Sequence, residues 1–271
     1  MKIKHSLKTL NNLLKAFEKQ PKLFRQIFRN VPTTCSAYEY SKSYKDVIPE
    51  NDVIKTAHEN PLWDYFQNHK EGHGIWKWEH YFDVYHKHFA KFIGKKVDVL
   101  EIGIYSGGSL EMWRSYFGDK CHIYGIDIEE ACRQYENDYV SVFIGDQESK
   151  PFWDDFKTKV EGVDVLIDDG GHTPEQQQVT LEQMLQHIRP GGVYICEDIH
   201  GNFNKFSTYA AGLVNELNSM GNNSQFQSAI HSIHFYPYML VIEKHAVKPK
   251  KLNAPKHGTI WQPFFIGTNN E

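Results

Sequence analysis

From residue 97 onward, short apolar runs alternate with longer mixed segments, and the runs end in acidic residues or glycine. A helix is expected near 205–219, and "SIHFY" and "MLVIEK" around Pro237-Tyr238 predict a closing antiparallel hairpin. The spacing of the earlier runs is typical of right-handed strand–helix–strand crossovers. We therefore predict an α/β fold with a doubly wound, mostly parallel, seven-stranded sheet. Its five parallel strands are expected at 97–103, 122–128, 140–147, 163–170 and 191–199.

The first 90 residues follow helical periodicity instead. Residues 1–30 carry eight Lys or Arg against Glu18 alone, and Pro21 interrupts their pattern. Such a basic segment is compatible with a helix on a membrane surface, and a helix docked on its own protein or a partner subunit is the simpler interpretation. The apolar positions at helical spacing are Leu7, Leu10, Leu14 and Phe17.

A second helical pattern runs through the aromatic stretch 63–89. Trp78, Phe82, Tyr85 and Phe89 keep the spacing of one helix face, so most of these aromatic residues are expected in the core. The chain thus divides into a helical N-terminal extension (1–90), an α/β domain (91–250) and a C-terminal tail (251–271).

Composition narrows the function classes. The chain has 271 residues and a net charge of −4, which argues against a general nucleic-acid binder. Its four cysteines show no C-x-x-C spacing, no signal peptide is visible and no apolar run approaches membrane-spanning length, so a cytoplasmic protein is expected. Fifteen histidines raise the alternative of a zinc site, but a companion cysteine pair or an H-E-x-x-H motif is lacking.

The residues that carry chemistry follow the predicted strands, where ligands of doubly wound sheets bind. After the first strand, "EIGIYSGGS" combines Gly103 and Gly107, which let backbone approach a ligand, with Glu101, which suits a positive charge. Asp127 after the second strand is placed for a ribose diol, and Asp146-Gln147 after the third for an adenine edge, with capping of the loop as the alternative role for each. An adenosine ligand with a positive charge is S-adenosylmethionine.

The fourth and fifth strand ends are more acidic. Asp168, Asp169 and His172 follow the fourth strand, and Glu197 and Asp198 follow the fifth. Crowded carboxylates repel unless they are protonated or share a cation, and oxygen ligands favour Mg²⁺ over zinc. Asp168 either borders the cofactor or braces the loop. Thr173 and Pro174 are expected as N-cap and first residue of the next helix.

Together "EIGIYSGGSL", "GIDI", "GDQ", "IDDGGH" and "PGGVYICEDI" resemble the macrocin/mycinamicin-type sugar O-methyltransferases. These are class I, Rossmann-like, S-adenosylmethionine- and metal-dependent enzymes, and relatives are often labelled cephalosporin hydroxylase or rhamnosyl O-methyltransferase. The likeness covers about residues 70–245. It implies Asp169, Glu197 and Asp198 as ligands of Mg²⁺ or a similar cation and His172 as general base. The cofactor-binding positions that it implies are Glu101, Gly103, Tyr105, Ser106, Gly107, Ser109, Asp127, Asp146, Gln147 and Asp168.

The expected function is methylation of a sugar hydroxyl on a glycan, glycolipid or glycosylated natural product, with polysaccharide biosynthesis as one setting. The N-terminal extension is expected to shape the acceptor pocket and to form contacts in a homo-oligomer, and its basic end is compatible with peripheral contact at the inner face of a membrane. Alternatives are an Fe(II)-dependent hydroxylase with His200 among its ligands, a catechol-type O-methyltransferase, and a non-catalytic partner with a degenerate domain.

Overall fold

The computed structural model describes residues 2–45, 59–220, 224–249 and 252–258, and the chain divides into two units, Met1–His58 and Glu59–Glu271. The expected boundary at residue 90 lies inside the second unit. Among the described residues, none of the helices has the length and hydropathy needed to cross a membrane.

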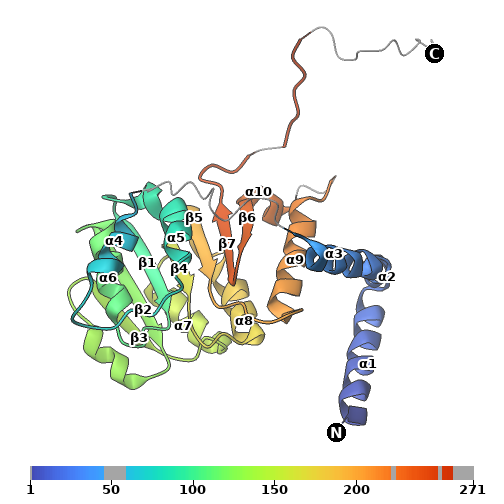
Figure 1. The fold of residues 1–271 in the computed structure, drawn as a ribbon, viewed down its shortest axis with the longest axis horizontal. Helices are drawn as coiled ribbons and strands as arrows, with labels where there is room; N and C mark the ends of the chain where they lie inside the picture. Colours follow the sequence, from blue (N-terminus) through green and yellow to red (C-terminus); the bar gives the residue numbers. More distant parts are fainter. Residues whose placement is uncertain (1, 46–58, 221–223, 250–251, 259–271) are drawn as a thin grey trace. The chain divides into compact units, whose positions relative to one another are not determined.

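The described part of the first unit, residues 2–45, contains three helices, α1 (Lys2–Lys19), α2 (Pro21–Arg29) and α3 (Val31–Ser43) (Figure 1). The expected break at Pro21 is confirmed, because α1 ends before it and Pro21 starts α2, where its missing N–H costs no hydrogen bond. The apolar side chains of Leu10, Leu14 and Phe17 are exposed.

The second unit is built on a seven-stranded sheet in the order β3-β2-β1-β4-β5-β7-β6. The first five strands pair in parallel and β7 pairs antiparallel with both β5 and β6, which confirms the predicted doubly wound sheet and closing hairpin. The strands are β1 (Val97–Ile102), β2 (Cys121–Asp127), β3 (Val140–Ile144), β4 (Val163–Asp168), β5 (Ile188–Cys196), β6 (Ile230–Tyr236) and β7 (Met239–Lys244).

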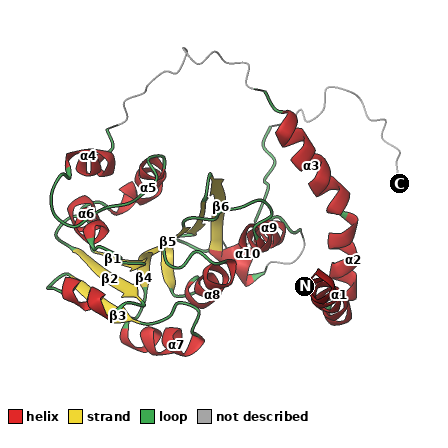
Figure 2. Ribbon diagram, turned by 60° about the horizontal axis from the view of Figure 1, so that its bottom comes forward, coloured by secondary structure: helices red, strands yellow, loops and turns green. Residues whose placement is uncertain are grey.

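Helices cover both faces of the sheet (Figure 2). One face carries α4 (Pro61–Asn68), α5 (Tyr81–Phe89, continued by η2, Ala90–Phe92) and α6 (Gly108–Phe117); the other carries α7 (Lys150–Lys159), α8 (Pro174–Met184) and α9 (Lys205–Leu217). The short helix α10 (Gln225–Ala229) precedes β6, and the β2–β3 connection is a 3₁₀ helix, η3 (Glu130–Tyr135). Thr173 caps α8 in a capping box with Gln176, and Pro174 starts that helix, as expected.

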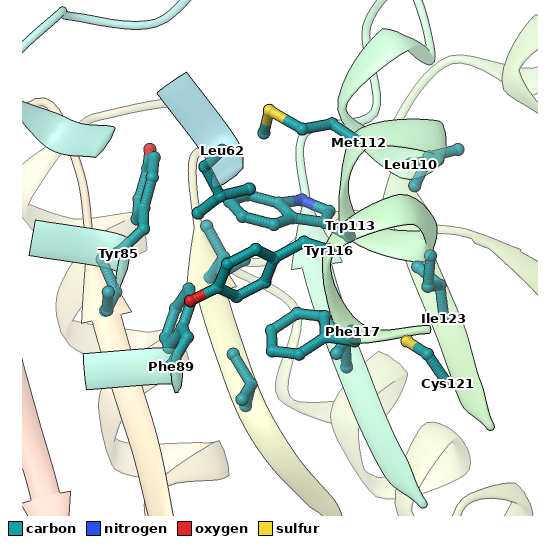
Figure 3. Close-up of a cluster of buried hydrophobic side chains, with 14 of the residues drawn as sticks. Leu62, Tyr85, Phe89, Leu110, Met112, Trp113, Tyr116, Phe117, Cys121 and Ile123 are labelled. Atoms are coloured by element: carbon teal, nitrogen blue, oxygen red, sulfur yellow. The ribbon is translucent and has the colours of Figure 1, made fainter. Parts of the chain in front are cut away.

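The aromatic stretch before β1 forms part of the core on the first face. Figure 3 shows the rings of Tyr85 and Phe89 from α5 gathered with Trp113 and Phe117 from α6. Phe82, Tyr85 and Phe89 are buried as expected, but the expectation that Trp78 continues this helix face is wrong. Helix α5 begins only at Tyr81, and Trp78 is 47% exposed because its chain segment runs across the carboxyl edge of the sheet.

Candidate active site

A cavity of about 800 Å³ opens at the carboxyl edge of the parallel strands. It is lined by residues that follow all five parallel strands and by a segment ahead of α5. The strand ends that the sequence singled out therefore meet in one place, as expected of a doubly wound sheet. Of the candidate residues, Glu101, Gly107 and Asp168 stand outside the lining. The candidates that line the cavity are Gly103, Tyr105, Ser106, Ser109, Asp127, Asp146, Gln147, Asp169, His172, Glu197 and Asp198.

Gly103 joins the loop after β1 to the loop after β4. Its φ is +89°, and a Cβ atom built on it would lie 2.0 Å from the carbonyl oxygen of Asp169. The backbone N–H of Asp169 in turn donates to the carbonyl of Ile102. Only glycine fits this contact, so the glycine loop directly sets the position of Asp169.

A second close approach brings a distant segment into the site. A Cβ on Gly108 would lie 2.3 Å from the carbonyl oxygen of His73, and Ser106 Oγ donates to the carbonyl of Gly74 at 2.7 Å. Residues 73–78, which we call the lysine segment, therefore cross directly over the glycine loop. Ser106, a candidate for cofactor binding, uses its hydroxyl here to hold this segment.

The candidate cofactor side combines a buried acid with a braced loop. Glu101 is fully buried, and its Oε2 accepts a hydrogen bond from Ser109 Oγ at 2.8 Å. Burial raises the pKa of Glu101, and nearby Lys77 opposes that shift. Asp127 Oδ2 accepts from the backbone N–H groups of Ile104 and Tyr105 at 2.9 and 3.0 Å, which shapes the loop while the carboxylate still faces the cavity.

Gln147 and Asp168 form a buried brace beneath the β4 loop. The Gln147 amide donates to Asp168 Oδ1 at 2.9 Å, and its oxygen accepts from the backbone N–H of Gly171 at 2.7 Å. Burial raises the pKa of Asp168 to about 7. These contacts favour the bracing interpretation of Asp168 over direct contact with a cofactor, and Gln147 takes part in the same brace.

Three candidate residues form a compact acidic cluster at the cavity floor. One ligand atom from each of Asp169, His172 and Asp198 lies within 4.8 Å of the others. His172 Nε2 lies 3.9 Å from Asp169 Oδ1 and 3.7 Å from Asp198 Oδ2. Within the described ranges, the buried His172 Nδ1 has no hydrogen-bond partner. The carboxylates of Asp169 and Asp198 lie close enough together to share a divalent cation, so the residues present are suited to the metal that the sequence motifs imply.

The backbone of this cluster is in an unfavourable conformation. His172 and Asp198 have φ values of +57° and +53°, and Tyr105, also in the cavity lining, has a φ of +48°. Left-handed backbone at residues other than glycine costs energy and concentrates at functional sites. This geometric observation indicates a functional site independently of any sequence motif.

Glu197, the remaining candidate metal ligand, faces other partners. It is buried, its Oε1 accepts a hydrogen bond from Tyr85 at 2.6 Å, and its Oε2 lies 3.1 Å from Lys77 Nζ. Burial raises the pKa of Glu197, and Lys77 opposes the shift. A role for Glu197 as metal ligand stays a prediction.

Lys77 is the functional candidate that sequence reasoning missed. Its side chain is 4% exposed, and Nζ lies 2.6 Å from Asp169 Oδ2, 3.1 Å from Glu197 Oε2 and 3.7 Å from Glu101 Oε1. Burial lowers the pKa of Lys77, but the three carboxylates outweigh burial, so the net pKa lies well above its ordinary value. The available signal was its place in "KWEHYF", within the region of family likeness but outside any strand end.

Aromatic side chains form the rim. Trp76 is 87% exposed and Tyr105 is also exposed, although both line the cavity. Trp78 Nε1 and the Tyr81 hydroxyl each donate to Asp198 Oδ1 at 3.0 Å. The Trp78 ring packs on Tyr238, with ring centres 5.3 Å apart. The rim thus offers flat apolar faces directly above the acidic cluster.

The fold is that of a class I methyltransferase, as the sheet order, the glycine loop and the acids at the strand ends indicate. Residues 100–199 match the family model described as a methyltransferase domain. Its curated relatives are sugar O-methyltransferases, which confirms the likeness expected from the motifs. The demethylmacrocin O-methyltransferase of Streptomyces fradiae is 34% identical over 122 residues, 42% of this chain and 30% of the relative. The 8-demethyl-8-alpha-L-rhamnosyl tetracenomycin-C 2'-O-methyltransferase of Streptomyces olivaceus is 28% identical over 202 residues, 64% of this chain and 53% of the relative.

A solved structure is similar as well. The MycE methyltransferase of the mycinamycin biosynthetic pathway, in complex with Mg, SAH and mycinamycin VI, is 25% identical with a TM-score of 0.57. The match covers 69% of this chain and 53% of that chain. The chain therefore spans about half or less of the lengths of these relatives.

Proposed function

We propose that this protein is an S-adenosylmethionine- and Mg²⁺-dependent O-methyltransferase that acts on a sugar hydroxyl of a glycosylated acceptor. One observation carries the proposal: Gly103 of the candidate cofactor loop directly contacts Asp169, so the candidate cofactor and metal residues line one cavity, as methyl transfer would require. The curated relatives, which are named for methylation of sugar groups on natural products, support the acceptor class.

The chain's own residues fit the roles that the reaction needs. In methyl transfer, the acceptor oxygen bonds to the methyl carbon while the carbon–sulfur bond breaks, and the hydroxyl proton passes to a base. His172 is the proposed base, because it lines the cavity and its Nε2 lies 3.9 Å from Asp169 Oδ1 and 3.7 Å from Asp198 Oδ2, beside the proposed site of the reacting hydroxyl. Glu101 and Ser109 would bind the cofactor, with Glu101 supplying negative charge on the side of the sulfonium.

Asp169 and Asp198 would hold the metal, with Glu197 as the further predicted ligand. When bound there, a divalent cation would polarise the acceptor hydroxyl and fix its direction. The exposed faces of Trp76 and Trp78 would pack against the apolar face of a sugar ring and exclude water from the reacting hydroxyl.

The test uses the whole chain with methyl-labelled S-adenosylmethionine, Mg²⁺ and a panel of glycans, sugar nucleotides and glycosylated natural products. Mass spectrometry should find methyl ether formation that a chelator abolishes and Mg²⁺ restores. Full activity without divalent cation would remove the metal from the mechanism. Product formation that instead requires Fe(II) and a co-substrate, without a methylated product, would favour the hydroxylase alternative.

His172→Ala should lower kcat by about 10²–10⁴-fold, the usual contribution of a general base, while calorimetry shows unchanged cofactor binding. His122→Ala is the matched control, because His122 on β2 hydrogen-bonds Ser141 and does not line the cavity. Near-normal turnover of the His172 variant would exclude it as the base.

For the first unit we propose subunit contacts, with peripheral contact at the inner face of the membrane as a second role and the cytoplasm as the compartment. The exposed Leu10, Leu14 and Phe17 of α1, beside its lysines, support such contacts. Light scattering of the full chain, and its sedimentation with anionic vesicles, distinguish a homo-oligomer from a membrane-bound protein. A polysaccharide acceptor would appear in the same acceptor panel.

A further inference from the structure

Lys77 places a positive charge among the carboxylates where the proposed reaction would bind a divalent metal and the sulfonium of the cofactor. Its ammonium group contacts Asp169 Oδ2 and Glu197 Oε2, the acids after two adjacent strands, and it reaches Glu101 on the cofactor side. The lysine segment that carries it precedes residues 100–199, the part that matches the methyltransferase domain. The lysine therefore lies outside the part of the chain that matches the family model, although it belongs to the same compact unit.

We infer that Lys77 is a resident cation of the carboxylate cluster that sets the affinity of the site for its two cationic ligands, the divalent metal and the sulfonium of the cofactor. The inference rests on the proposed function. It assigns a positioning and specificity role, because Lys77 acts through the carboxylates that it shares with these ligands.

The charges of the cluster support this role. Glu101, Asp169, Glu197 and Asp198 would carry four negative charges when ionised. Lys77 neutralises one of them, and a divalent cation together with a sulfonium would neutralise the other three. The lysine therefore leaves less negative charge in the site for the metal and the sulfonium to neutralise.

The geometry indicates that Lys77 competes with the metal and the sulfonium for the same carboxylates and does not help to bind them. Lys77 binds Asp169 through Oδ2, while Asp169 Oδ1 faces His172 and the side of the cluster suited to a metal. Two cations on one carboxylate repel each other strongly where little solvent screens them. The same repulsion reaches the sulfonium through Glu101, whose Oε1 lies 3.7 Å from Lys77 Nζ. Removing the charge while keeping the length of the side chain should therefore tighten the binding of both cations.

The experiment compares Lys77→Met with Lys91→Met in the full chain. Lys91 also pairs with a carboxylate, Glu243 at 3.3 Å, but does not line the cavity, so it controls for the loss of a lysine charge. Calorimetry measures Mg²⁺ affinity in the presence of S-adenosylhomocysteine, and it also measures the affinities for S-adenosylmethionine and S-adenosylhomocysteine. These two cofactors share their nucleoside and amino-acid groups, and only the first carries the sulfonium charge.

We expect Lys77→Met to bind Mg²⁺ about tenfold more tightly and to shift its preference toward S-adenosylmethionine by about threefold or more, as loss of a nearby like charge requires. The Lys91 variant should match the wild type. If the Met variant does not fold, Lys77→Gln also removes the charge while keeping a polar end group, and it replaces the Met variant in the same measurements.

The outcomes separate this inference from the proposed function. A wild type that binds both ligands, with unchanged or weaker binding in the Lys77 variants, overturns the inference alone, and weaker binding of both ligands would make Lys77 a structural support only. A wild type that binds neither ligand overturns the proposed function and the inference with it.

Discussion

Removal of the Tyr85 hydroxyl tests how the acidic site is held in place. Tyr85 is fully buried in α5, and its hydroxyl donates to Glu197 Oε1 at 2.6 Å. Burial and the neighbouring carboxylates raise the pKa of Tyr85 well above its ordinary value, so the hydroxyl stays protonated and acts as the donor. Burial raises the pKa of Glu197 to about 8, so the bond to a charged carboxylate forms above that pH and persists up to pH about 10, the ordinary pKa of tyrosine.

The expected cost follows from the partner. A buried hydrogen bond to a charged group contributes roughly 1.5–3 kcal/mol, and Tyr85→Phe also leaves an oxygen of the buried Glu197 without its donor. We expect a loss of about 2–3 kcal/mol in the free energy of unfolding of the second unit. For a domain of this size, that loss lowers Tm by about 5–10 °C.

Tyr194→Phe is the matched control. Tyr194 is equally buried and also faces a buried carboxyl group, but its hydroxyl lies 3.4 Å from Asp168 Oδ2, beyond the usual range for such a bond. Its loss should cost less than about 1 kcal/mol. Urea unfolding and calorimetry at pH 9, above the raised pKa of Glu197, measure both variants. Equal costs, or a Tyr85→Phe/Glu197→Gln double variant whose cost is the sum of the single ones, would refute the argument that the Tyr85–Glu197 bond holds the site.

Two further predictions concern single contacts. Gly103→Ala should weaken cofactor binding more than tenfold in calorimetry, because its Cβ would meet Asp169. The control Gly94→Ala, with a φ of +71° and nothing within 4 Å of its Cβ, should leave cofactor binding unchanged and cost only about 1–2 kcal/mol of stability. Equal effects of the two variants on cofactor binding would contradict the contact between Gly103 and Asp169. Of the four cysteines only Cys35 is exposed, and burial raises the pKa of Cys121 to about 12. Thiol titration of the native protein up to pH 9 should therefore find one fast group, lost in Cys35→Ser, and a second fast group would disprove the burial.

The sheet could be predicted because the signal for each strand lies in a short run of consecutive residues. A buried parallel strand needs an unbroken apolar run, and the acids after it mark its carboxyl end. The start of α5 was harder, because Trp78 repeats the helical spacing of Phe82 and Tyr85 although it lies outside the helix. Periodicity records which positions are apolar and does not record whether the backbone at that position is already helical.

The two adjacent acids after β4 could be separated only in part from the sequence. The resemblance implied Asp169 as a metal ligand and Asp168 as a cofactor-binding position. In the structure Asp169 lines the cavity, and Asp168 is buried against Gln147. The two adjacent acids after β5, Glu197 and Asp198, both line the cavity, so the place of an acid in the sequence does not decide whether it faces a ligand.

The contacts of Lys77 with Asp169 and of Tyr85 with Glu197 could not be predicted. Each joins residues more than ninety positions apart, and no sequence periodicity indicates such pairs. Both residues come from the stretch 73–89, ahead of β1, yet both end on Glu197 at the far side of the site. Without that stretch, Glu197 would be a buried carboxylate that has lost two of its partners, a situation that costs several kcal/mol. A physical boundary at residue 90 would therefore cut through the site, and the stretch before it belongs to the same folding unit as the acids that it neutralises.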